Sequence, residues 1–226
     1  MIKLLTLALL AGAAFGTPNF AFVQQATSVS SGTPGARSAA FGSNNTPGNV
    51  IIVLAYTGST TISDSAGNSY AEVPWSVGPG MRVYAATHIL GGANTVAAVS
   101  EEAIVAIEYS SVSSTYCVFD GSEQTGGTNV INNGVYVTAS EAMAVFSAQN
   151  CCGGAGSSLA AGSIRGVASA GGMGYFWGDY DMASVPSTYT NIDSFTPTAS
   201  GSRVVFISQT GTGCVGPASG SFAILY

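Results

Sequence analysis

Charged residues are scarce in this chain of 226 residues. Asp, Glu, Lys and Arg make up 7% of it, against roughly a quarter of an average soluble protein. The few cations are scattered rather than gathered into a basic stripe, so nucleic-acid binding has little electrostatic support. A surface with so few charges also lacks the like-charge repulsion that keeps copies of a protein apart. This composition favours a protein that packs against copies of itself or is displayed outside a cell.

Histidine is nearly absent too. The single histidine, His88, excludes zinc sites and acid–base pairs that need two histidines. A Ser-His-Asp triad would have to use His88, but the chain lacks the Gly-x-Ser-x-Gly elbow. By alternation His88 shares a strand face with Arg82, Tyr84 and Ala86, where we expect it to be solvated. No Cys-x-x-Cys or Cys/His spacing indicates a metal site, and we predict neither a metal nor a cofactor.

Four cysteines are present, Cys117, Cys151, Cys152 and Cys214, and they allow three pairings. A bond between the neighbours Cys151 and Cys152 closes a strained ring. We therefore expect two disulfides that link Cys117 and Cys214 to this pair. Each would contribute on the order of 3–4 kcal/mol in the chain-entropy model.

The N-terminal segment predicts the compartment. Residues 1–16, MIKLLTLALLAGAAFG, have one early cation, an apolar run and small residues before a cleavage point after Gly16, which is the pattern of a secretory signal peptide. The run is too short to span a membrane, and the alternative is an ordinary hydrophobic N-terminal segment. We predict a secreted protein, located outside the cell or on a virion surface, with no stable membrane span after processing.

The rest of the chain has an abundant β pattern. Short runs of period two, rich in β-branched and aromatic residues, alternate with clusters of Gly, Pro, Asn and Ser. This pattern predicts one all-β domain over residues 17–226, a single antiparallel β-sandwich of jelly-roll type. The polar segments 110–133 and 150–162 are expected to be long loops. The expected strands are residues 20–26, 49–56, 69–75, 81–89, 94–100, 103–110, 134–139, 142–149, 163–169, 172–178, 202–209 and 221–226.

Two turn sequences interrupt the first strands. In TISDSAGNSYAEV (61–73) Asp64 suits the first position of a turn and Gly67 suits a positive φ, so we expect a hairpin. A calcium loop would need several converging oxygens, and this stretch has a single aspartate. LGGANTV (90–96) is likewise expected to be a tight hairpin connection, with Asn94 or a glycine in the left-handed conformation.

The order of GNVIIVLAY, ISDSAGNSY, MRVYAATHILGGANTV and AIVAIEYSSV resembles a poorly characterised group of secreted bacterial and bacteriophage virion-associated proteins. The likeness covers residues 20–112. It implies a jelly-roll-like sandwich outside the cytoplasm and implies no catalytic residue. The second half of the chain departs from this pattern.

Two stretches are candidates for chemistry. Glu108 shares a strand face with Ile104 and Ala106, so it could be a partly buried carboxylate of a glycosidase pair; the alternative is a structural carboxylate that accepts hydrogen bonds. GYFWGDYDM (174–182) concentrates aromatic rings beside carboxylates, as sugar-binding sites do. Its predicted glycan platform comprises Tyr175, Trp177, Asp179, Tyr180 and Asp181, and the alternative is that alternate aromatics fill the core.

Two functions remain after these exclusions. The first is a non-catalytic structural or display protein, a subunit of a surface assembly or a virion component that mediates self-association or attachment. Its partners would be copies of itself or other surface or virion proteins. The second is a secreted carbohydrate-binding, or less readily carbohydrate-cleaving, β-sandwich module with a glycan as ligand.

Overall fold

The computed structural model describes residues 20–30, 33–56, 61–73, 81–111, 116–125, 130–138, 142–151, 156–159, 162–170, 172–182, 187–195 and 198–209. Over these residues the secondary structure consists of strands without any helix, and every paired strand is antiparallel. The predicted all-β, jelly-roll-like fold is confirmed. Within the same ranges no helix could span a membrane. Residues 1–16 lie outside the described residues.

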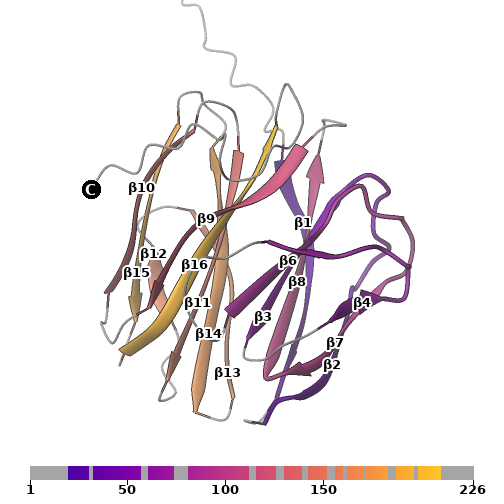
Figure 1. Ribbon diagram of the computed structural model, residues 1–226, viewed down its shortest axis with the longest axis horizontal. Coiled ribbons are helices and arrows are strands. Elements are labelled where there is room, and N and C mark those ends of the chain that lie inside the picture. The colour runs from indigo at the N-terminus through magenta and orange to yellow at the C-terminus, as the bar shows by residue number, and fades with distance from the viewer. Residues whose placement is uncertain are drawn as a thin grey trace, which may run out of the picture.

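The strands before residue 112 form two sheets (Figure 1). Their alternation between the sheets is that of a jelly roll. In spatial order, the five-stranded sheet contains β1 (Phe20–Val29), β8 (Ala103–Ser111), β3 (Val50–Tyr56), β6 (Met81–Ala86) and β5 (Ala71–Glu72), and the three-stranded sheet contains β2 (Gly35–Ala40), β7 (Thr95–Glu101) and β4 (Ile62–Asp64).

The strands after residue 115 repeat this topology, each taking the place of the strand eight earlier. We call residues 20–111 the first repeat and residues 116–209 the second repeat. The order β9-β16-β11-β14-β13 copies β1-β8-β3-β6-β5, and β10-β15-β12 copies β2-β7-β4. The five-stranded sheet contains β9 (Tyr116–Thr125), β16 (Thr198–Gln209), β11 (Ala142–Cys151), β14 (Met173–Met182) and β13 (Ser163–Ala170), and the three-stranded sheet contains β10 (Val130–Thr138), β15 (Ser187–Phe195) and β12 (Gly156–Leu159).

The sheets stack with the two five-stranded sheets in the middle (Figure 1). One hydrophobic core lies between these central sheets and joins both repeats, with Ile52, Tyr109, Val145 and Trp177 among its members. A second core lies inside the first repeat, between its two sheets. Because the first core is continuous across the repeats, the two jelly rolls form one packed unit rather than separate bodies.

Strand β3 shows why the sequence folds this way. All seven residues of VIIVLAY are buried, as expected for a strand covered on both faces. Alternate side chains enter different cores: Val50, Ile52 and Leu54 pack toward the second repeat, while Ile51 and Val53 pack inside the first. The continuous apolar run is thus the signature of a central strand in a stack of more than two layers.

The two segments expected to be long loops contain strands instead. Residues 116–125 form β9 and residues 156–159 form β12, and β15 (Ser187–Phe195) had no predicted counterpart. Their sequences are rich in Gly, Ser, Thr and Asn and lack a clear apolar alternation. Pairing with a partner strand, rather than local propensity, makes such segments extended.

Neither turn sequence closes a hairpin. Strand β4 pairs with β7 in one sheet, whereas β5 pairs with β6 in the other, so the turn around Asp64 carries the chain across the sandwich. Residues 87–94 cross in the same way between β6 and β7. The positive φ predicted at Gly67 is confirmed at 82°, and Gly92 has a φ of 109°. The turn chemistry was predicted correctly and the partner strands were not.

The register of the second repeat limits the disulfide prediction. Cys152 and Cys214 lie outside the described residues, and the pairing stays a prediction. The backbone of Cys117 is opposite Ser208 on β16, whereas that of Cys151 is opposite Thr198. These positions are about 30 Å apart at roughly 3.3 Å per residue, while a disulfide needs Cα atoms within about 7 Å. The register therefore places Cys117 and Cys151 near opposite ends of β16.

Candidate functional site at the seam between the repeats

The start of β13 is shaped to bring one cation inward. Gly162 has a φ of 102°, and a Cβ there would collide with the backbone carbonyl of Asp179. A bulge in the pairing with β14 follows between Ile164 and Gly166. Bulges re-aim side chains, and here Arg165 lies at the bulge and reaches the carboxylate of Asp179. A close-packed glycine and a bulge thus position the guanidinium.

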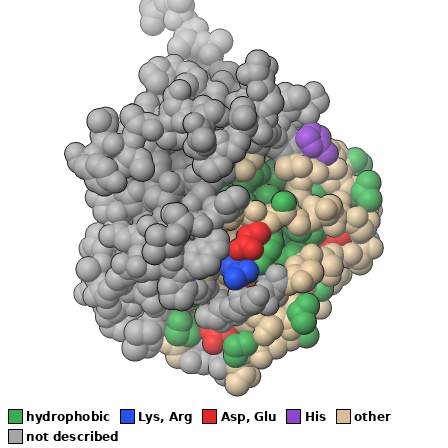
Figure 2. Space-filling view, in the orientation of Figure 1, with side chains coloured by type: hydrophobic (Ala, Val, Ile, Leu, Met, Phe, Trp, Pro, Cys, Tyr) green, Lys and Arg blue, Asp and Glu red, His purple; other side chains and the backbone are tan. Residues whose placement is uncertain are grey.

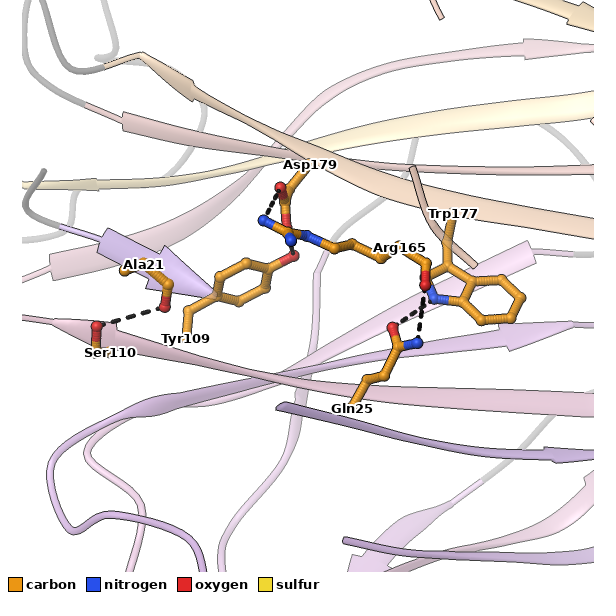
Figure 3. A network of polar contacts seen from close by, with 7 residues as sticks. All are labelled: Ala21, Gln25, Tyr109, Ser110, Arg165, Trp177 and Asp179. Carbon is orange, nitrogen blue, oxygen red and sulfur yellow. Dashed lines mark hydrogen bonds and ion pairs between the residues drawn. The ribbon is translucent and has the colours of Figure 1, made fainter. Parts of the chain in front are cut away.

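Asp179 of β14 is the centre of a polar cluster at this seam (Figure 3). The residue is 2% exposed. Arg165 binds it in bidentate fashion, with Nε 2.7 Å from Oδ2 and Nη2 2.9 Å from Oδ1. Tyr109 of β8 donates its hydroxyl proton to Oδ2 at 3.0 Å. The carboxylate therefore ties the second repeat to the first.

Burial and charge keep the two donors of this cluster, Tyr109 and Arg165, in their protonated forms. Burial, reinforced by the Asp179 carboxylate, raises the pKa of Tyr109, so the phenol keeps its proton and remains a donor. Burial lowers the pKa of Arg165, but its bonds to Asp179 outweigh this and leave the pKa raised. The guanidinium also lies over the ring of Phe22, 4.2 Å from its centroid, in a cation–π contact.

Gln25 of β1 adds a second link beside the cluster (Figure 3). Its amide nitrogen donates to the backbone carbonyl of Arg165 at 2.9 Å, and its amide oxygen accepts from the indole Nε1 of Trp177 at 2.9 Å. Gly166 leaves room for this indole, because a Cβ there would collide with the Trp177 ring. The edge strands of both central sheets are thus held together by side chains.

A surface pocket of about 540 Å³ opens beside the cluster, a size within the usual range for small-ligand sites. Phe20 and Phe22 contribute apolar surface, and Arg165 contributes its partly exposed guanidinium. Of the predicted glycan platform, Asp179, Tyr180 and Asp181 line this pocket. Tyr180 is half-buried and Asp181 is exposed. These residues could contact a polar ligand that enters from solvent.

The other two members of that platform fill the core. Tyr175 is 1% and Trp177 3% exposed, and both belong to the cluster between the central sheets. Tyr175 packs on Tyr56 with ring centroids 4.7 Å apart and donates its hydroxyl to Glu102 at 3.1 Å. Because neither ring presents a face to solvent, the core alternative considered for these two residues is the one that the structure supports.

Glu108 is buried as predicted, on the face that carries Ile104 and Ala106. It is 0% exposed. Its Oε2 accepts from the side-chain amides of Gln24 at 2.7 Å and Asn45 at 2.6 Å, and its Oε1 from Asn49 at 2.6 Å and the backbone N–H of Thr46 at 2.9 Å. With four donors on two oxygens, the carboxylate anchors the 41–49 connection to the sheet. This geometry is that of a structural carboxylate that accepts hydrogen bonds. It is not the geometry of a proton-transfer group that faces a substrate.

Asp64 is the centre of a similar cluster of hydrogen bonds. We call each of these two clusters, around Glu108 and around Asp64, a carboxylate knot. Its Oδ2 accepts from Asn68 Nδ2 at 2.7 Å, Tyr70 at 2.7 Å and Asn94 at 2.8 Å, and its Oδ1 accepts from the backbone N–H of Asn68 at 2.9 Å. Partial burial acts to raise the pKa of Asp64, but the hydrogen bonds outweigh it and the pKa is lowered. Asn68 accepts in turn from the backbone N–H of Leu90. ISDSAGNSY and LGGANTV therefore meet at one carboxylate, which makes both sequences structural.

His88 is not on a strand. It follows the end of β6 and is exposed with a φ of 53°, because the chain leaves the sheet at this point to cross to β7. Among the described residues no cluster of His, Cys, Asp and Glu could hold a metal ion.

Arg165, Tyr109 and Gln25, which build the seam, were not predicted. They come from three different strands, β13, β8 and β1. No local sequence motif therefore identifies them. Comparison with protein-family models, with curated proteins and with solved structures finds no match to this chain.

Proposed function

We propose that this protein is a non-catalytic structural subunit of an extracellular surface assembly, such as a virion surface, that acts by self-association or attachment. The main support is how its buried carboxylates are used. Glu108 and Asp179, 0% and 2% exposed, bind loops and repeats together through several donors each. Buried carboxylates whose oxygens all accept hydrogen bonds from the protein make a scaffold rigid rather than perform proton transfer.

Surface composition and the N-terminal sequence agree with this proposal. On the described part of the face in Figure 2, tan and green atoms predominate and charged side chains are few, so copies of the chain repel one another weakly. Residues 1–16 have the pattern of an export signal. The resemblance of residues 20–112 to virion-associated sandwiches supports the same class.

Solution size tests the proposal. Protein exported by a secretory host and purified without denaturation should associate with rising concentration, as measured by light scattering coupled to size exclusion. A strict monomer over the whole soluble range would contradict it.

One observation favours carbohydrate binding as the second function: Tyr180 and Asp181 line the 540 Å³ pocket beside Arg165. A tyrosine ring can stack on a sugar and a carboxylate can accept from its hydroxyls. Titration with an oligosaccharide panel would detect such binding. Asp181→Ala and Tyr180→Ala should then weaken it, whereas Leu90→Ala, at an exposed position outside the pocket lining, should not.

A further inference from the structure

Strand β13 is an open edge of the second repeat's central sheet. It pairs with β14 on one side, and no described strand pairs with its other side. Ile164 and Val167 on this strand are 47% and 49% exposed. They are opposite Gly178 and Phe176 in the register, so both lie on the same face of the sheet. The edge therefore combines backbone positions that no described strand pairs with and exposed apolar side chains.

Beyond its bulge, β13 lacks the usual protection of a sheet edge. Natural edges are blocked by lysine, by inward-pointing charges, by bulges, by proline or by being very short, and the bulge and the inward-pointing Arg165 protect only the start of β13. Two other edges fit that rule: β5 has two residues, and β9 carries Asp120 and Glu123. In β13 the only charged residue, Arg165, is bound to Asp179 at the seam. The stretch Gly166–Ala170 is left with no charge and no proline.

We propose that Gly166–Ala170 of β13 is the surface through which two copies of this chain associate, by antiparallel pairing of β13 with β13 of the second copy. A twofold axis brings the same strand against itself. Because the stretch is uncharged, no like charges face each other across the axis, whereas a charged partner strand would find no counter-charge. The pairing would join the β13-containing sheet of one copy to the same sheet of the second copy, which makes one continuous sheet across the dimer.

The bulge sets where this pairing ends. At Arg165 the backbone carbonyl already accepts from Gln25, so pairing of a second copy at this position would compete with that bond. Beyond the bulge the register with β14 is regular from Gly166 to Ala170. The paired segment is therefore short, and the exposed Val167 adds apolar burial to its backbone hydrogen bonds. This inference rests on the proposed function and names the surface that would carry out its self-association.

A lysine pair tests the surface. Ile164→Lys with Val167→Lys introduces the protection that β13 lacks, and both positions are half exposed, so the fold should tolerate the change. The matched control is Val99→Lys, 66% exposed on β7, which has partners on both sides. Sedimentation equilibrium should give a dimer dissociation constant at least about tenfold higher for the double variant and unchanged for the control.

Hydrogen exchange of the wild-type protein provides a second measurement that needs no variant. Amides in Gly166–Ala170 should exchange more slowly as the protein concentration rises, while those of β9 should not change. If the wild type dimerises but the lysine pair and Val99→Lys behave alike and β13 gains no protection, this surface is refuted and self-association stands. A wild type that never associates refutes the proposed function itself.

Discussion

The two repeats have the same strand order, but their described buried carboxylates lie on different strands. In the first repeat, Glu108 on β8 and Asp64 on β4 each gather several donors from nearby connections. The corresponding strands of the second repeat, β16 and β12, contain no acidic residue. The second repeat instead places Asp179 on β14, where it bonds across the seam to Tyr109. Among the described side chains, the first repeat uses Glu108 and Asp64 to fix its own loops, and the second repeat uses Asp179 to hold its neighbour.

This difference shows that strand order does not require a particular polar core. A mostly apolar sequence can place β3 and β11 alike at the centre of their sheets. Buried carboxylates then hold loops or a neighbouring repeat in place, and they can lie at different positions in each repeat. We therefore expect the stability of the first repeat to depend most on the hydrogen bonds of Glu108 and Asp64. The stability of the second repeat should depend most on the contacts of Asp179 at the seam.

Removal of Glu108 should have the largest effect and would break the first half of this comparison. Glu108→Ala leaves three side-chain amides and the backbone N–H of Thr46 without their acceptor. Each buried unsatisfied group costs about 1–3 kcal/mol, and partial rehydration makes about 4 kcal/mol a fair total. Urea unfolding measures it. The control is Glu102→Ala, where a partly buried carboxylate loses its bond from Tyr175. Equal losses in the two variants would show that the knot does not anchor the first repeat.

Removal of Asp179 at the seam should cause the second largest loss of stability. Asp179→Ala leaves the Arg165 guanidinium and the Tyr109 hydroxyl without their partner. Breaking a buried pair typically costs about 3–5 kcal/mol, and because the Arg165 side chain is 28% exposed we expect about 3 kcal/mol. In Arg165→Met with Asp179→Ala the loss should be smaller than the sum of the single losses. Additive losses in this double-mutant cycle would contradict the coupling.

Two glycine substitutions sharpen the contrast between packing and turn geometry. Gly166→Ala forces a Cβ against the Trp177 ring, and overpacking of this kind costs about 2 kcal/mol. Gly67→Ala meets open space but keeps a φ of 82°, which costs about 1 kcal/mol. Thermal unfolding should rank Gly166→Ala as the less stable. The reverse order would mean that the indole can move away from β13.

Sequence reasoning located most strands but not their partners. The apolar runs in VIIVLAY and AIVAIEYSS are clear because both strands are central, while β9, β12 and β15 become strands through nonlocal pairing that no local pattern encodes. The burial of Glu108 followed from its strand face, but its donors lie about sixty to eighty residues away along the chain. The duplicated topology was invisible because the repeats share strand order and not motifs. Tyr175 and Trp177 suggested a ligand because aromatic content alone does not distinguish a core from a binding surface.

The smallest effect concerns the pH dependence that the Asp64 knot gives to the first repeat. Because the pKa of Asp64 is lowered in the folded state, its contribution to stability is complete above the unfolded value of about 3.9 and is lost as pH falls through the lower folded value. Asp64→Asn should therefore be less stable than the wild type at pH 7, by about 1 kcal/mol, with a difference that narrows on acidification. Tyr70→Phe removes one donor and keeps the carboxylate, so its profile should lie between the other two. Parallel profiles of unfolding free energy from pH 7 to pH 2 would show that the knot holds the turn by geometry alone.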